Sequence, residues 1–225
     1  WAFEKFKGVQ DKLGTQMRAV GEVMSIGKTY KEAFQKAIRS LEIGRYGLGF
    51  AKDFNAKTKE DLLKLLITPS SERHFIMYEA LRKGATVDEI FEITKVKKYF
   101  IEQMKELVDE EEALLACKGA LPSDAQLISA KKNGFSDKYL SQLLAVSEDD
   151  VRNRRIELGV EEAWEGIHVS GTKDSAYYYS TYNAPDKNPV NSDKPKIMIL
   201  GGGPNRIGQG IEFDYCISCF KEAWI

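Results

Sequence analysis

Apolar residues in the middle of the chain recur every three or four positions, which is the spacing of one face of an α-helix. Start and end signals divide residues 58–159 into short helical segments. A Ser or Thr followed three residues later by an acid predicts a helix start, and glycine predicts a helix end. The starts are Thr58–Asp61, Thr86–Glu89 and Ser147–Asp150, and the ends are Gly84, Gly119, Gly134 and Gly159. We therefore expect this region to be almost wholly helical.

An internal repeat lies within the helical region. GATVDEIFEITKVKKYFIEQ, from Gly84, aligns with GFSDKYLSQLLAVSEDDVRN, from Gly134, at an offset of 50 residues. The aligned pairs include Thr86 with Ser136, Ile90 with Leu140, Ile93 with Leu143, Val96 with Val146 and Ile101 with Val151. Two similar helical units that pack together explain the repeat, because each has an apolar face it cannot bury alone. The alternative is that any two capped amphipathic helix pairs align this well.

The first 44 residues have a mixed pattern. Residues 20–26 form a short β-like run. Thr29 and Glu32 then form a predicted capping box, and Gly44 is placed as the end of the helix. The apolar positions at helical spacing are Ala33, Ala37, Ile38 and Leu41. This part is expected to be the tail of an α/β unit.

The pattern changes again after Gly159. AYYYSTYN, residues 176–183, is aromatic and β-branched, which predicts an extended segment. Residues 184–195 carry three of the six prolines and few apolar residues, which predicts a linker. KIMIL, residues 196–200, is then typical of a buried strand.

Composition and charge narrow the function classes. The chain has 225 residues, of which 43% are hydrophobic, and 33 basic and 34 acidic side chains give a net charge of -1. This balance argues against a protein of nucleic acids or membrane surfaces, which has a basic excess. No run approaches the ~18 apolar residues of a membrane helix. Three cysteines form no disulfide framework, which favours the cytoplasm. The start WAFEKF has neither an initiator Met nor a signal peptide, so we expect a piece of a longer protein.

The helix start and end signals of the second repeat copy are arranged as in a DNA-binding helix-turn-helix, with Arg152, Arg154 and Arg155 on its second helix. Between Gly134 and Gly159, however, four basic side chains face five acidic ones. Three of these acids stand in the first turn of that helix, where they would repel DNA and suit the helix dipole. Packing is therefore the preferred interpretation, and a free-standing helical adaptor or DNA-binding module is the alternative.

The other clusters of reactive side chains predict no catalytic or metal site. The acidic run Asp109–Glu112 is expected to be a solvated helix face, since consecutive carboxylates point around a helix. Cys216 and Cys219 have metal-site spacing, but no second pair stands near them, so core cysteines are expected. With His74 and His168 as the only histidines, no catalytic triad can be assembled.

The glycine loop after residue 200 is the strongest site signal. It meets neither the Walker A pattern nor the dinucleotide fingerprint, which would need glycine where Arg206 stands. A strand that leads through glycines into a helix still places backbone amides at a helix N-terminus, where anions are favoured. The residues alone therefore predict the start of an open α/β sheet near a ligand.

The loop LGGGPNRIGQGIEFDYC resembles the opening of each synthetase half of the carbamoyl-phosphate synthetase large subunit. TQMRAVGEVMSIGKTYKEAFQKAIRSLE is similar to the end of the first half of that subunit, and GFSDKYLSQLLAVSEDDVRNRR and YYYSTYN are similar to its helical oligomerisation domain. The resemblance implies a mainly α fold: a central helical oligomerisation domain flanked by truncated α/β segments related to ATP-grasp units. It implies four segments: 1–45, the tail of the first synthetase unit; 46–183, the oligomerisation domain; 184–195, a linker; 196–225, the start of the second unit.

The resemblance also implies a function for the longer protein. The family makes carbamoyl phosphate, for arginine or pyrimidine synthesis, from bicarbonate, glutamine-derived ammonia and two ATP, with Mg or Mn and K. A glutamine amidotransferase small subunit is the implied partner. The metal-binding and ATP-gripping motifs of the family are not found here, so this chain is expected to be inactive alone, with no catalytic residue and no cofactor. The loop residues that match the family are Gly201, Gly203, Arg206, Gly208, Glu212 and Asp214.

Self-association through the helical domain is the role that the resemblance implies for this chain. Apolar side chains on the repeat helices would provide the contact. The interface residues proposed from the sequence are Phe91, Tyr99, Phe100 and Leu107. Burial in the core is the alternative for each of them.

Overall fold

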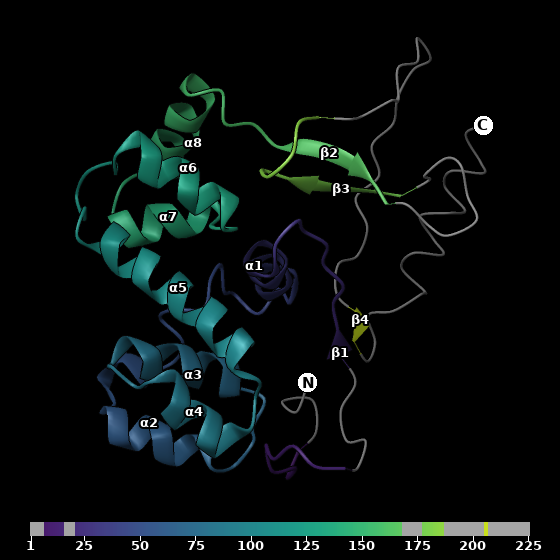
Figure 1. Ribbon diagram of the computed structural model, residues 1–225, viewed down its shortest axis with the longest axis vertical. Coiled ribbons are helices and arrows are strands. Elements are labelled where there is room, and N and C mark those ends of the chain that lie inside the picture. Colours follow the sequence, from purple (N-terminus) through teal and green to yellow (C-terminus); the bar gives the residue numbers. More distant parts are fainter. Residues whose placement is uncertain (1–6, 16–20, 168–176, 187–204, 207–225) are drawn as a thin grey trace.

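The computed structural model describes residues 7–15, 21–167, 177–186 and 205–206 of the chain (Figure 1). The helices are α1 Tyr30–Ser40, α2 Lys59–Leu66, α3 Arg73–Arg82, α4 Val87–Thr94, α5 Lys98–Leu115, α6 Asp124–Lys132, α7 Asp137–Leu144 and α8 Glu148–Glu157, with the short 3-10 helix η2 Phe54–Ala56. The strands are β1 Gly21–Glu22, β2 Ala163–Gly166, β3 Tyr178–Thr181 and β4 Asn205–Arg206. The predicted mainly α fold is confirmed.

The helices begin where their capping residues predict. The side chains of Thr58, Thr86 and Ser147 each accept the backbone amide three residues on, and the last two belong to complete capping boxes. The box predicted at Thr29 is wrong in its second half. Thr29 Oγ1 accepts the amide of Glu32 at 3.2 Å, but the Glu32 carboxylate accepts the amide of Lys28 at 2.8 Å instead of that of Thr29.

The 50-residue repeat is present in the backbone. The bounds of α7 are those of α4 moved by 50 residues, and α8 begins 50 residues after α5. The residue after α4 and the residue after α7 both have a left-handed backbone, with φ 58° at Lys95 and 55° at Ala145. The glycines before these helices, Gly84 and Gly134, have φ 87° and 93°, a region that glycine adopts without strain. Two units of one local design therefore make up the helical centre.

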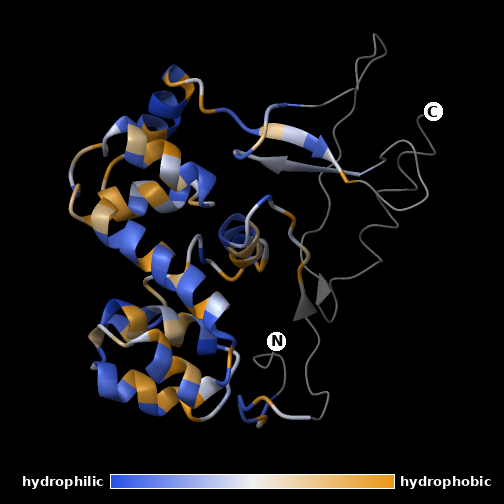
Figure 2. Ribbon diagram, viewed as in Figure 1, coloured by the Kyte–Doolittle hydropathy of each residue, from blue (hydrophilic) through white to orange (hydrophobic). Residues whose placement is uncertain are grey.

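Helix α5 joins the two units into one core. It packs against α3 and α4 of the first unit and against α7 of the second (Figure 1). Apolar and polar positions mix along each of these helices (Figure 2), as expected of amphipathic helices. The buried face of α5 consists of Ile101, Met104, Leu107, Val108, Glu111 and Leu114. The equivalent residues Ile90 and Leu140 are fully buried in the same cluster.

Two small antiparallel sheets flank the helices. The extended segment predicted after Gly159 is confirmed as β3, which pairs with β2 in the register Ala163 to Thr181. The sequence pattern did not predict β2. The first β-like run contains β1, which pairs with β4 in the glycine loop. No helix in the described residues is long and apolar enough to span a bilayer.

Helix α1 buries a polar face. Its buried residues are Glu32, Gln35 and Ile38, whereas Ala33, Ala37 and Leu41 are only half-buried. Of the apolar positions predicted for this helix, Ile38 is buried in the core and Leu41 packs against the core. The two buried polar side chains face α6 and the segment after β3, which supply their hydrogen-bond partners.

Candidate oligomerisation surface and buried polar clusters

Leu107 does not belong to the surface proposed from the sequence. Its side chain is 0% exposed, on the same face of α5 as Met104 and Glu111. The prediction is wrong for this residue because its helical register places it toward α3 and α7, where it fills the core. Phe91 is half-buried and packs against that core, with the ammonium groups of Lys95 and Lys98 both 5.4 Å from its ring centre.

Tyr99 and Phe100 are exposed, at 54% and 39% of their surfaces. They stand in the first turn of α5 and contact each other and the ring of Tyr30 on α1. The ring centres of Tyr30 and Phe100 are 5.1 Å apart, and Tyr30 also stacks on Phe34 at 5.3 Å. We call these four rings the aromatic cluster. Its outer rings are available for a partner, and their role in self-association stays a prediction.

Other apolar side chains on the helical domain are exposed that were not predicted from the sequence. They include Leu65, Ile67, Leu121 and Ile156. Leu65 and Ile67 belong to the largely apolar run of residues 62–67, and one helix face cannot bury every residue of such a run. The length of this apolar run was the sequence signal that could have predicted the exposed residues.

The acidic run on α5 contains a buried carboxylate, so the prediction of a wholly solvated face is wrong. Glu111 is 0% exposed, whereas Asp109 and Glu112 are exposed. The hydroxyls of Tyr78 and Tyr139 donate to Glu111 Oε2 at 2.5 and 2.9 Å, and Arg82 forms an ion pair with Glu111 Oε1. Tertiary partners rather than the local run decide which acid is buried.

Burial sets the protonation of this cluster. Desolvation raises the pKa of Glu111, while the Arg82 charge and the two tyrosine hydrogen bonds oppose the rise. Desolvation and the nearby Glu111 charge raise the pKa of Tyr78 and Tyr139 well above the ordinary value. The tyrosines therefore stay protonated and serve as hydrogen-bond donors that help hold α3, α5 and α7 together.

Two of the three arginines of α8, Arg154 and Arg155, are engaged within the protein. Arg154 donates to both carboxylate oxygens of Asp124, at 2.7 and 2.9 Å, and Arg155 Nε donates to Asp137 at 2.7 Å. Groups that pair with neighbouring carboxylates are poorly placed to neutralise phosphates. This pairing favours packing over the DNA-binding alternative.

Asp137 organises a second polar cluster at the start of α7. One of its oxygens pairs with Lys131 at 2.7 Å, and the other with Arg155. The same two cations lie over the ring of Tyr182, at 4.8 and 6.0 Å from its centre. Burial raises the pKa of Tyr182 to about 12. The cluster therefore holds the segment that follows β3 against α6 and α8.

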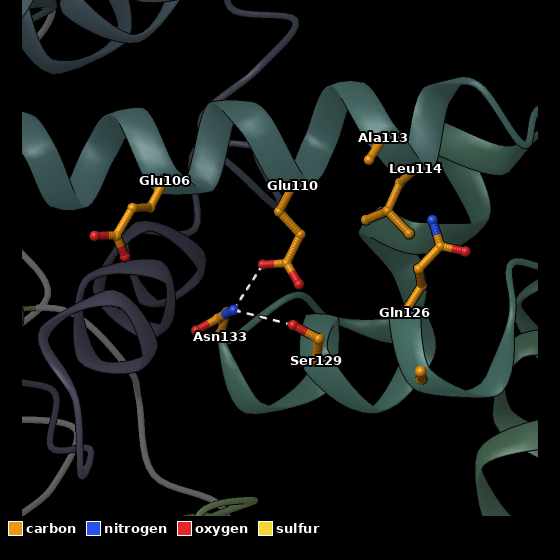
Figure 3. A pocket seen from close by; sticks show the side chains of 8 residues that line it. Glu106, Glu110, Ala113, Leu114, Gln126, Ser129 and Asn133 are labelled. Atoms are coloured by element: carbon orange, nitrogen blue, oxygen red, sulfur yellow. Dashed lines mark hydrogen bonds between the residues drawn. The ribbon is translucent and has the colours of Figure 1, made fainter.

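Cavities in the described part of the chain lie apart from these clusters. One, of about 410 Å³, lies between α5 and α6 (Figure 3), where Asn133 Nδ2 donates to Glu110 at 2.7 Å. Another, of about 480 Å³, lies between α1 and the β2–β3 hairpin, and its lining includes Lys36, Arg39 and Trp164. Among the described residues, no three His, Cys, Asp or Glu side chains gather as metal ligands would.

The glycine loop lies outside the described residues except for β4, Asn205–Arg206. This applies to Gly201, Gly203, Gly208, Glu212 and Asp214, and also to Cys216 and Cys219. For Arg206 the structure describes only the backbone pairing of β4 with β1. The predicted roles of these residues stay predictions.

Comparison with family models decides the family. Residues 22–159 match the model described as "Carbamoyl-phosphate synthetase large chain, oligomerisation domain". The chain belongs to the carbamoyl-phosphate synthetase large-chain family. Residues 193–223 match a second model, "Carbamoyl phosphate synthase preATP-grasp domain". The family resemblance seen in the sequence is thereby confirmed, whereas the boundaries at residues 45, 183 and 195 stay predictions.

Curated carbamoyl phosphate synthase large chains are similar over almost the whole of this chain. One from Synechocystis is 43% identical over 221 residues, which cover 96% of this chain and 20% of the relative. The Arabidopsis thaliana "arginine-specific large chain, chloroplastic" is 44% identical, with 96% of this chain and 18% of the relative covered. One from Archaeoglobus fulgidus is 43% identical, with 96% and 21% covered. The chain spans about a fifth of the length of these relatives.

Proposed function

We propose that this chain is a non-catalytic linker and self-association segment of a carbamoyl-phosphate synthetase large subunit. The match of residues 22–159 to the oligomerisation domain of the family is the observation that carries the proposal. The order of the two matched domains along the chain supports the linker role, since the helical part precedes the start of a preATP-grasp domain. The aromatic cluster supplies exposed apolar surface for a second copy.

The complete enzyme is proposed to be a cytoplasmic, ATP-dependent carbon–nitrogen ligase. It would make carbamoyl phosphate from bicarbonate, ammonia and two ATP, with Mg or Mn and K, and take its ammonia from a glutamine amidotransferase subunit. The names of the relatives support this proposal. This chain alone is proposed to have no turnover, because its sequence lacks the ATP-gripping motifs of the family.

Light scattering of the 225-residue chain over a wide concentration range tests self-association. We expect the molar mass to rise with concentration from 25.4 kDa toward about twice that value. A chain with both Tyr99→Ser and Phe100→Ser should remain monomeric, because the change removes the exposed rings of the cluster. Ile156→Ser is the matched control, since Ile156 is 45% exposed on α8.

Two outcomes would contradict the proposal. A wild-type mass that stays at one chain at all concentrations rules out association by this segment. A dimer that the double variant and the Ile156→Ser control weaken equally places the contact elsewhere than the aromatic cluster. Far-UV circular dichroism of both variants checks that the helices are retained.

A further inference from the structure

The C-terminal end of α6 is bound by side chains from distant parts of the chain. The last carbonyls of a helix have no partner within the helix and need donors from elsewhere. Three consecutive carbonyls here are satisfied in that way. Lys132 O accepts from Asn183 Nδ2 at 2.8 Å, Asn133 O from Gln35 Nε2 at 3.2 Å, and Gly134 O from Arg39 Nη1 at 2.5 Å. Helix α1 and the segment after β3 therefore meet at one helix end.

The Glu32 carboxylate joins the two approaching segments. Its Oε2 accepts from the Lys28 amide at 2.8 Å and from Asn183 Nδ2 at 3.1 Å, and its Oε1 accepts from the Tyr182 amide at 3.3 Å. The residue is 2% exposed. The hydrogen bonds to Glu32 all come from neutral N–H groups, and the charges of Lys36 and Arg39 on the same helix interact with it electrostatically.

Close backbone packing fixes α1 at this position. A Cβ atom on Gly134 would lie 2.9 Å from Glu32 Cα and 3.2 Å from Glu32 O. Such distances are too short for carbon, so the end of α6 lies directly against the backbone of α1. Glu32, which binds the segment after β3, thus stands on a helix that cannot shift toward α6.

We propose that Glu32 is a positioning residue that locks the exit segment, Tyr182 and Asn183, onto α1 and the end of α6. The exit segment leads from β3 toward residues 193–223, which match the preATP-grasp domain. Glu32 therefore fixes the direction in which the chain leaves the helical domain. That consequence for the longer enzyme rests on the proposed function, whereas the lock itself is a property of this chain.

Hydrogen exchange of the 225-residue chain tests the lock, because the Tyr182 amide itself donates to Glu32. Glu32→Gln keeps the shape of the side chain but replaces one oxygen with an NH2 group. In either orientation of the amide, at least one donor from the exit segment then faces another donor. We expect the amides of residues 182 and 183 to exchange about tenfold faster or more, with little dependence on low urea, as in a local opening. Amides in α5 should keep their wild-type rates.

Two further variants make the outcome decisive. Glu79→Gln changes an equally buried glutamate on α3 that is 3% exposed, and it should leave exchange in the exit segment unchanged. Asn183→Ala removes the donor to Glu32 and Lys132 without altering the carboxylate, so it tests the lock even where Glu32→Gln fails to fold. Unchanged exchange at Tyr182 in both Glu32→Gln and Asn183→Ala overturns the proposal. So does an acceleration that extends equally to α5, because it would reflect global unfolding.

Light scattering separates this inference from the proposed function. Tyr99 and Phe100 contact the ring of Tyr30, and neither is a hydrogen-bond partner of Glu32 or Asn183. A monomeric chain in which Glu32→Gln frees the exit segment would end the self-association proposal and leave the lock in place. A dimer in which neither Glu32→Gln nor Asn183→Ala changes exchange in the exit segment would support self-association and overturn the lock.

Discussion

Alanine at Gly134 should destabilise the chain more than alanine at Gly84, its equivalent in the first repeat unit. Both glycines have the same left-handed backbone, with φ 93° and 87°. An L-residue in that conformation costs roughly 1–2 kcal/mol, partly offset by the lower entropy of the unfolded chain. This backbone cost is common to both sites and cancels in the comparison.

The surroundings of the added methyl group differ between the two sites. At Gly84 no atom lies within 4 Å of a Cβ, whereas at Gly134 the backbone of Glu32 and Gln35 Cβ lie 2.9 to 3.2 Å away. Relieving this overlap requires α1 to move, and forced overpacking costs about 1–3 kcal/mol. Gly134→Ala should therefore lower the free energy of unfolding by about 1–3 kcal/mol more than Gly84→Ala does. For a chain of this length, the corresponding difference in Tm is roughly 2–12 °C.

Urea unfolding followed by far-UV circular dichroism measures both variants against the wild type. A change in midpoint at constant m-value gives the loss of stability directly. Equal losses at the two glycines would refute the reasoning, because they would mean that α1 does not lie against the end of α6. A larger loss at Gly84 would also contradict it.

Two further predictions concern buried titratable groups. Glu111→Gln should lower the free energy of unfolding by about 1–3 kcal/mol, because the neutral amide loses the ion pair with Arg82 and turns an NH2 group toward buried donors, although Arg82 keeps its pairs with Glu79 and Glu112. Asp109→Asn on the exposed side of α5 should change the free energy of unfolding by less than about 0.5 kcal/mol, and similar losses for the two variants in urea unfolding would contradict the burial of Glu111. Burial lowers the pKa of His74 from 6.5 to about 4, so the unfolded chain binds the proton first and stability falls as the pH drops through that window. The ring of His74 lies beside that of Phe34, so His74→Phe keeps an aromatic ring at this position. The variant should remove up to about 3 kcal/mol of the fall in the free energy of unfolding between neutral pH and pH about 4. An unchanged pH dependence of unfolding would contradict the lowered pKa of His74.

The helical centre could be predicted from the sequence because its signals are local. A capping residue such as Ser147 and a glycine such as Gly134 act on backbone groups within a few residues, so their effect does not depend on the rest of the fold. The 50-residue offset was visible for the same reason, since both units carry the same local signals. These features settled the fold class, whereas the candidate surface at Tyr99 and Phe100 followed from the family resemblance.

The tertiary structure alone decided which polar groups are buried and what they hold. Glu32 has the sequence context of a capping acid and Glu111 that of a solvated acid, yet both are buried because Asn183 in one case and Arg82 in the other come from far along the chain. Leu107 belongs to the core because α3 and α7 cover that face of α5. Desolvation and its compensation depend on partners in space, and the order of residues in a chain does not specify those partners.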